Sequence, residues 1–228
     1  MRRRSGFSTP GTSEDSNDNN VPDECEVRMN RYIPLVPDAA AELVGYQVTL
    51  TYSLEFPDSQ GSNWWVDAPD ENGVSRLSRF PVFRDWSSDP KLIYVGDCAI
   101  VPAAVYEIRI AVAGVGWGDS IEVATIHAPG IRYYGDVVGV GTGAMPPTVG
   151  FTGPDGIVNV TDVQAFLMTA EGDATPSTPT PWVDLHGNGT GVPPNFILNV
   201  SDLQRILFGL EGQMYTDSTD QLDPANCP

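Results

Sequence analysis

The feature that most limits the possible folds is an internal repeat in the C-terminal third of the chain. Residues 157–172 read IVNVTDVQAFLMTAEG and residues 197–212 read ILNVSDLQRILFGLEG, with 8 of 16 aligned positions identical. The two copies lie 40 residues apart. Such a duplication indicates one structural unit used twice, because a repeated sequence encodes a repeated architecture.

Each copy predicts one helix of about ten residues. Thr161 and Ser201, each followed three positions later by a glutamine, fit a capping box, and Gly172 and Gly212 stand where C-caps are expected. Helices this short are not stable alone in water, so we expect their apolar stripes to pack together. The stripes are Val160, Val163, Phe166, Leu167 and Ala170 in the first copy and Val200, Leu203, Ile206, Leu207 and Leu210 in the second.

Oxygen donors around the start of each helix follow the spacing of an EF-hand-type calcium loop. Such a loop has ligands at positions 1, 3, 5, 7, 9 and 12, with a backbone carbonyl at position 7 and glycine favoured at position 6. The candidate ligands at positions 5, 7, 9 and 12 are Asp155, the Ile157 carbonyl, Asn159 and Asp162 in loop one, and Asn195, the Ile197 carbonyl, Asn199 and Asp202 in loop two.

Position 1 is irregular in both copies. Strict spacing places Phe151 there in loop one, and its side chain cannot bind a cation. By analogy between the copies, the nearest suitable carboxylates are Asp136 and Asp184, each followed by a Gly/Pro-rich insertion. We expect the insertions to loop out, because the entropy of closing a loop rises only slowly with its length.

Residues 27–134 have the pattern of strands rather than of helices. Residues 47–56 alternate strictly between polar and apolar side chains, and residues 106–112 alternate in the same way. Further strands are expected at 31–36, 63–67, 79–83, 91–95, 121–127 and 131–134. About eight short strands predict an antiparallel β-sandwich, so the fold class is mainly β with a small α-helical domain following it.

The charge balance excludes some partners. Twelve Lys and Arg residues stand against 30 Asp and Glu residues, and the net charge of −18 repels nucleic acid. No apolar run is long enough to span a bilayer. An Asp-rich chain does suit Ca²⁺, which prefers oxygen ligands.

The residue types and motifs that usually carry catalysis indicate a protein that is not an enzyme. The chain has two histidines and no recognisable nucleophile or metalloprotease motif, although carboxylates that meet only in space stay possible. His186 is expected to be a surface imidazole. Four tryptophans could form a carbohydrate-stacking platform, with packing in the core as the commoner alternative; they are Trp64, Trp65, Trp86 and Trp117.

The residues near the ends of the chain do not decide the cellular compartment of the protein. Residues 1–14 are polar and expected to be disordered, and no apolar segment follows Arg2, Arg3 and Arg4 as in an export signal. The protein is therefore either cytosolic or a piece of a longer exported chain. Three widely spaced cysteines, Cys25, Cys98 and Cys227, do not decide between these alternatives.

The paired segments GPDGIVNVTDV and PNFILNVSDL resemble the type I dockerin duplication, in which a calcium loop and a helix occur twice and pack antiparallel. The resemblance covers about residues 135–212 and departs from the family at the interrupted opening of each loop. It implies extracellular calcium binding by a dockerin-like domain at 135–228. In cellulosomal relatives it also implies docking to a cohesin domain.

The segment 15–26, DSNDNNVPDECE, resembles a thrombospondin type 3 calcium repeat. The ligands implied by this resemblance are Asp15, Asn17, Asn19, the Val21 carbonyl, Asp23 and Glu26. The layout as a whole resembles exported bacterial proteins. We therefore expect an extracellular or cell-surface calcium-binding module, and the alternative is an accessory or anchoring region of a polysaccharide-degrading enzyme.

Overall fold

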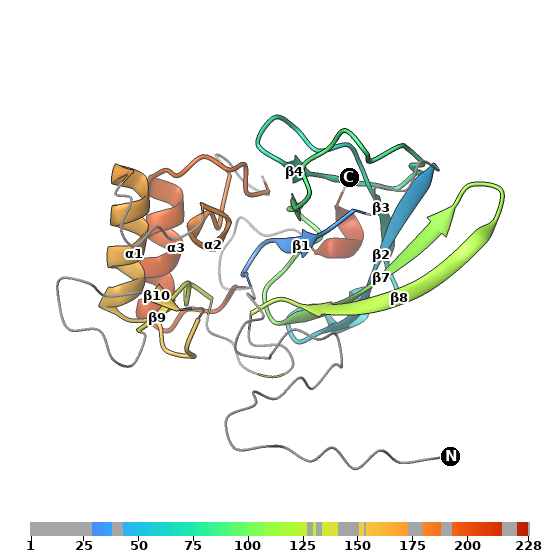
Figure 1. Cartoon of the computed structure of the whole chain (residues 1–228). Helices are drawn as coiled ribbons and strands as arrows, with labels where there is room; N and C mark the ends of the chain where they lie inside the picture. Colours follow the sequence, from blue (N-terminus) through green and yellow to red (C-terminus); the bar gives the residue numbers. More distant parts are fainter. Residues whose placement is uncertain are drawn as a thin grey trace, which may run out of the picture.

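The computed structural model describes residues 29–37, 43–126, 130, 134–140, 151–152, 154–172, 180–187, 193–215 and 223–227. Within these residues the chain is mainly β, with two larger sheets and three α-helices. Figure 1 shows the helices side by side at one end of the molecule and the longest strands at the other. The expected architecture, mainly β with a helical C-terminal part, is thus present in its coarse form.

The larger sheet has five strands in the order β5-β3-β2-β7-β8, and neighbouring strands are antiparallel. Both strands that the alternation predicted, β2 and β7, lie in this sheet as neighbours, with Val48 of β2 opposite Ile108 of β7. Because period-two sequences place alternate side chains on opposite faces, both valine and isoleucine are buried. The strands are β2 (Val44–Ser53), β3 (Asn63–Val66), β5 (Leu77–Ser78), β7 (Ala104–Val112) and β8 (Gly116–Ala124).

The smaller sheet has three strands in the order β1-β6-β4. Its strands are β1 (Ile33–Leu35), β6 (Ile93–Val95) and β4 (Val74–Ser75); β6 pairs antiparallel with β1 and parallel with β4. A separate two-stranded sheet joins β9 (Gly139–Val140) to β10 (Phe151–Thr152). A 3₁₀ turn, η2 (Pro57–Ser59), follows β2.

One strand prediction is wrong. Residues 79–83 contain no strand, and the pairing in this region lies earlier, in β4 and β5. A strand of two residues is too short to show an alternation of polar and apolar side chains, so its position cannot be predicted from that pattern. Residues 131–133 of the expected strand at 131–134 lie outside the described residues, and Tyr134 itself is in a turn.

The repeat forms the two expected helices, α1 (Val160–Glu171) and α3 (Val200–Leu210), with α2 (Thr180–Val183) between them. The helices contact one another. Their N-caps are Asn159 and Asn199 rather than the hydroxyl residues predicted from the capping-box pattern. The capping boxes are completed by Asp162 and Asp202, whose side chains accept from the backbone N–H groups of the caps. In each copy the asparagine and the hydroxyl residue lie two positions apart, and both residue types suit an N-cap. The capping-box pattern alone therefore favours the wrong residue.

The expected apolar stripes are also partly wrong. Leu167 and Leu207 are 45% and 39% exposed, whereas Phe166 and Ile206 are buried. The helix faces that pack inward are therefore centred on Phe166 and Ile206. Gly172 is the predicted left-handed C-cap of α1, whereas Gly212 lies one residue beyond the C-cap of α3.

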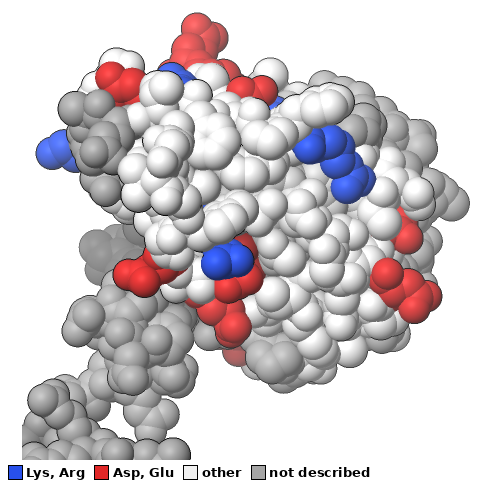
Figure 2. Space-filling model, turned by 90° about the vertical axis from the view of Figure 1, so that its right-hand side faces the viewer, with Lys and Arg blue, Asp and Glu red and all other residues white. Residues whose placement is uncertain are grey.

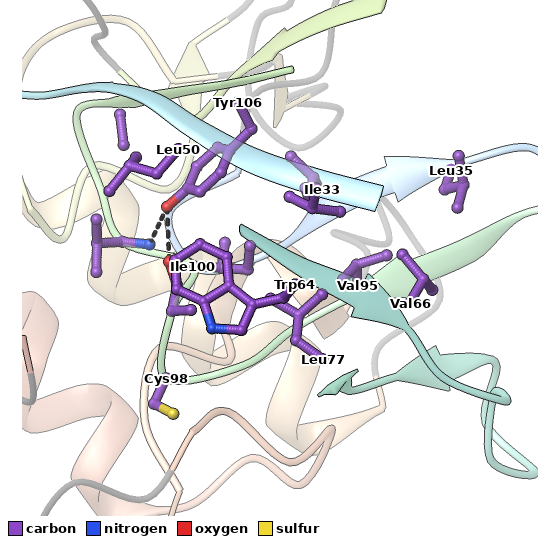
Figure 3. Packing of buried hydrophobic residues seen from close by; sticks show 14 of the residues in the cluster. Ile33, Leu35, Leu50, Trp64, Val66, Leu77, Val95, Cys98, Ile100 and Tyr106 are labelled. Carbon is purple, nitrogen blue, oxygen red and sulfur yellow. Dashed lines mark hydrogen bonds between the residues drawn. The ribbon is translucent and has the colours of Figure 1, made fainter. Parts of the chain in front are cut away.

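One buried hydrophobic cluster runs from the sheets into the helices, joining residues such as Trp64 and Tyr106 to Phe166 and Ile206. Figure 3 shows its sheet side, where Ile33 and Val95 lie near Trp64 and Tyr106. The Tyr106 hydroxyl donates to the Ala99 carbonyl at 2.9 Å and accepts from the Val101 N–H at 2.8 Å. The buried tyrosine is thereby fully paired with backbone.

A disulfide between Cys98 and Cys227 returns the C-terminal residues to the sheets. The adjoining 3₁₀ turn, η4 (Pro224–Asn226), begins at Asp223, whose carboxylate accepts from Ser59. Arg79 donates to the carbonyls of Ala225 and Cys227 at 2.8 and 3.0 Å. Sequence spacing could not have identified this pairing, because the two cysteines are 129 positions apart.

Candidate metal centres

Loop one brings Asp136 to the start of the repeat. Its carboxylate accepts hydrogen bonds from the backbone N–H groups of Asp155 at 3.3 Å and Gly156 at 2.7 Å. The insertion of 141–150 separates the two segments in sequence, and the β9–β10 pair brings its ends together. Gly156 has φ +90°, a left-handed conformation that glycine adopts without strain. The proximity expected for a position-1 carboxylate is therefore present, and its role as a ligand stays a prediction.

Loop two repeats this arrangement with different residues. The Asp184 carboxylate accepts from the backbone N–H of Phe196, the residue equivalent to Gly156. Phe196 also has a left-handed backbone, with φ +65°, which is unfavourable for a bulky side chain. Asp184 is fully buried.

The position-12 carboxylates, Asp162 and Asp202, are fully buried and make equivalent hydrogen bonds. Oδ1 of Asp162 accepts from the N–H groups of Val137 at 2.8 Å and Val138 at 3.1 Å. Oδ1 of Asp202 accepts from the N–H groups immediately after Asp184, at 2.8 Å each. Each position-12 side chain thus ties the helix start to the strand or turn that carries the position-1 carboxylate.

The turns between positions 5 and 9 are the same in both loops. Asp155 and Asn195 accept from the N–H groups of Ile157 at 3.0 Å and Ile197 at 3.1 Å. The side-chain amides of Asn159 and Asn199 donate to the Ile157 and Ile197 carbonyls, each at 3.0 Å. The predicted calcium ligands at positions 5, 7 and 9 consequently lie together in each loop.

Burial raises the pKa of these aspartates. Desolvation raises the pKa of Asp162 to about 6 against three backbone hydrogen bonds that lower it, and the Asp136 charge adds to the increase. Desolvation raises the pKa of Asp184 to about 7, with a further increase from the nearby Asp202 carboxylate. The pKa of Asp202 is raised by the same burial.

One buried oxygen marks where a cation fits. Among the described residues no N–H or hydroxyl group donates to the buried Oδ1 of Asp184, and the Asp184 and Asp202 carboxylates are close enough to repel each other when both are ionised and to share a hydrogen bond when one is protonated. Burying an unpaired carboxylate oxygen is costly unless a cation or a proton compensates it. The donor set of carboxylates, amides and carbonyls is the one that Ca²⁺ prefers, so the residues of loop two fit a calcium ion.

Two other predictions concern residues elsewhere. Residues 15–26, with Asp15, Asn17, Asn19, Val21, Asp23 and Glu26, lie outside the described residues. His186 is buried rather than at the surface, with its Nδ1 against the Gly187 carbonyl, because it follows Asp184 and Leu185 into the interior.

A third cluster of possible ligands contains Asp97, Cys98 and Cys227. The disulfide consumes both thiols, so the cluster lacks the thiolates that would bind a soft metal. The Asp97 carboxylate instead accepts from the N–H groups of Leu77 at 3.0 Å and Cys98 at 2.6 Å.

The four tryptophans of the predicted platform divide into two groups. Trp64 and Trp86 are buried in the core. Trp65 and Trp117 meet on the other face of the five-stranded sheet, with ring centroids 5.6 Å apart. Gly45 lies beneath Trp65, where a Cβ atom would collide with the ring, and Ala111 is paired with Trp117.

The residues that sequence reasoning missed lie just before β1. Asn30 donates to the Asp136 carbonyl at 3.0 Å, Arg31 donates to the Leu185 carbonyl at 3.3 Å, and the Tyr32 hydroxyl donates to Asp184 at 2.5 Å. These contacts span more than 100 residues, and no local pattern in the sequence signals them.

Comparison with known proteins gives no match: no family model, no curated protein and no solved structure is similar to this chain. None of the helices in the described part of the chain has the length and apolar character that crossing a bilayer requires.

Proposed function

We propose that this chain is an extracellular or cell-surface calcium-binding module without enzymatic activity, in which a β-sandwich carries a dockerin-like pair of loop–helix repeats. The observation that carries the proposal is the buried Asp184 carboxylate beside that of Asp202, with no N–H or hydroxyl group of the described residues donating to its Oδ1. Two carboxylates in this arrangement repel each other unless something positive lies with them. A calcium ion supplies that charge.

The proposed ligand sets follow the equivalent positions of the two loops. Loop one would use Asp136, Asp155, the Ile157 carbonyl, Asn159 and Asp162, and loop two would use Asp184, Asn195, the Ile197 carbonyl, Asn199 and Asp202. The bound ion supplies charge neutralisation, and the protein's own residues hold the helix starts and loop ends together. Metal binding is thereby coupled to folding.

Two features support an exported location. The Cys98–Cys227 disulfide would persist in an oxidising compartment and is rare in the cytosol. The net charge of −18 is also compatible with a compartment rich in calcium, where bound ions offset part of the repulsion.

The helices offer a surface for a protein partner. Val160 and Val200, at equivalent positions of the two repeats, are 73% and 77% exposed. Ile157 and Ile197 are exposed beside them at equivalent positions. Apolar residues exposed at equivalent positions of both repeats suit an interaction site, so we propose that a cohesin-like protein binds here.

The direct test is calcium titration of the full chain by calorimetry, with metal content measured after gel filtration. We expect the wild type to bind calcium and the double variant Asp162→Ala/Asp202→Ala to lose binding at both loops. Asp119→Ala removes an exposed carboxylate from β8 and serves as the matched control. A wild type that binds no calcium at millimolar concentration, or a double variant that binds as the wild type does, contradicts the proposal.

A second candidate function is carbohydrate binding, as in an accessory region of a polysaccharide-degrading enzyme. Trp117 is 50% exposed and stacks beside Trp65, with Arg109 5.0 Å from its ring. Figure 2, which views the side where β8 lies, shows a broad area with few charged residues. Affinity electrophoresis in soluble polysaccharide tests this function: Trp117→Ala should abolish retardation, and the exposed Phe80→Ala should not. A wild type that is not retarded rules it out for the glycans used.

A further inference from the structure

Three consecutive residues outside the repeats reach both calcium loops. The Asn30 side chain donates to the carbonyl of Asp136 in loop one, and the Arg31 guanidinium donates to the carbonyl of Leu185 beside loop two. The Tyr32 hydroxyl reaches a carboxylate instead of a backbone carbonyl, donating to Oδ2 of Asp184 at 2.5 Å. All three residues are buried, so residues 30–32 form a strap between the sheets and the repeats.

The ring of Tyr32 is held in one place by its surroundings. It packs against Gly96, where a Cβ atom would collide with the ring, and it meets Tyr94 edge-on at 6.4 Å between centroids. Met29 and Val74 complete a small buried cluster around it. Packing by residues outside the loop therefore helps to place the hydroxyl at Asp184, and Phe196 of loop two packs against the same cluster.

Loop two differs from loop one at position 6, which is next to its contact with the strap. Loop one has Gly156 at position 6, whereas loop two has Phe196 in an unfavourable left-handed conformation. The Phe196 ring lies 6.3 Å from that of Tyr94, and its N–H lies 3.3 Å from the Tyr32 hydroxyl. Contacts with the sheet side thus compensate for the strain at Phe196 in loop two.

We infer that Tyr32 is a positioning residue for calcium in loop two, and that calcium there fastens the strap of residues 30–32 to the repeats. The inference rests on the proposed calcium function. With Oδ2 of Asp184 held by Tyr32 and the Phe196 N–H, Oδ1 is left for the cation. A group that orients a ligand carboxylate raises its affinity for metal, and the bound metal in turn stabilises the oriented group.

Loop one has no equivalent side-chain contact from the strap among the described residues. Asn30 reaches the backbone carbonyl of Asp136 and not its carboxylate. Calcium in loop one is therefore expected to order its own helix without fastening the strap. This asymmetry distinguishes the inference from a general stabilisation of the fold by calcium.

The test compares calcium binding by full-length Asp162→Ala, in which loop two alone keeps its position-12 carboxylate, with the same chain also carrying Tyr32→Phe. Removing an outer hydrogen bond to a metal ligand typically weakens affinity about 10–100-fold, and we expect that loss here. Tyr106→Phe removes another buried tyrosine hydroxyl, which pairs with the backbone of Ala99 and Val101 and not with a loop carboxylate, and should leave calcium affinity unchanged.

Hydrogen exchange provides a second measurement that does not depend on a variant of Tyr32. In the wild type, calcium should slow amide exchange in residues 30–36. Asp202→Ala should abolish this calcium effect, and Asp162→Ala should retain it. Gly96→Ala, which displaces the Tyr32 ring while keeping its hydroxyl, should reduce the effect.

The outcomes separate the inference from the function on which it rests. If the wild type binds no calcium, the proposed function fails. If calcium binds but Tyr32→Phe leaves the affinity of loop two unchanged, or both aspartate variants retain equal protection of residues 30–36, the function stands and the inference is overturned.

Discussion

Asp136 and Gly156 are 20 positions apart, yet the carboxylate of the first accepts a hydrogen bond from the backbone N–H of the second at 2.7 Å. The β9–β10 pair holds the two ends of the intervening segment together. Loop one therefore gathers three aspartates, Asp136, Asp155 and Asp162, whereas loop two gathers Asp184 and Asp202 with the neutral Asn195.

The difference in charge predicts the order of calcium affinities. Because more anionic ligands bind Ca²⁺ more tightly, loop one should be the tighter site, with affinity on the order of 10⁻⁴ M or better. Calorimetric titration of the two single variants tests the order: Asp162→Ala should remove the tighter event and Asp202→Ala the weaker one. The opposite assignment would mean that the long insertion keeps Asp136 from the metal.

The calcium-free protein should lose stability as pH rises from about 4 to about 7. The folded state holds protons on Asp162 and Asp184, with pKa values of about 6 and 7, more tightly than the unfolded chain does. The stabilisation that comes from these bound protons is fully present below the pKa that the aspartates have in the unfolded chain. It is lost as the pH rises through the pKa that they have in the folded protein. Calcium favours the ionised carboxylates, so its protective effect should grow over the same range.

Urea denaturation at pH 5 and pH 7.5, with and without calcium, measures this linkage. Asp162→Asn, which cannot ionise at that position, should show a smaller loss between the two pH values. A calcium-free wild type that is more stable at pH 7.5 than at pH 5 would argue that these carboxylates are not desolvated.

The helix core gives a matched pair of neighbouring substitutions. Ile206 is fully buried, so Ile206→Ala should lower the free energy of unfolding by about 2–5 kcal/mol. Leu207 is 39% exposed, so Leu207→Ala should cost less than about 1 kcal/mol. Denaturant titration in saturating calcium measures both, and equal losses would contradict the burial pattern of α3.

Removing the disulfide should cost about 2–5 kcal/mol, because the cross-link restricts the unfolded chain across a long loop. The variant Cys98→Ser/Cys227→Ser tests this without leaving a free thiol at either position. Thermal unfolding of this variant and of the wild type, with and without reductant, provides the comparison. Reductant should lower the melting temperature of the wild type alone.

Local patterns predicted the parts of the fold that local chemistry determines. The helix positions follow from the duplicated sequence, and the strands β2 and β7 follow from the alternation that buries Val48 and Ile108, whereas their pairing with each other does not. The cap residue was misassigned because Asn159 and Thr161 both suit an N-cap, and only the three-dimensional structure shows which one accepts the hydrogen bond.

The rest depends on contacts between distant segments. Asp136 could be proposed as part of loop one only by analogy between the copies, and nothing near Tyr32 signals its contact with Asp184, 152 positions away. The exposure of Leu167 was also unpredictable, since an apolar stripe on a helix does not say which of its edges the rest of the protein covers.

The Cys98–Cys227 bond also sets the path of mechanical force through the molecule. Tension applied between residue 29 and residue 227 passes along the chain to Cys98 and then crosses the disulfide directly to Cys227. Residues 99–226, which include both loops and the helices, lie outside this covalent path, so the intact bond prevents this segment from being extended between its two ends. Force spectroscopy should therefore show the repeats extending only after reduction, so that the disulfide acts as a mechanical bypass around the calcium sites.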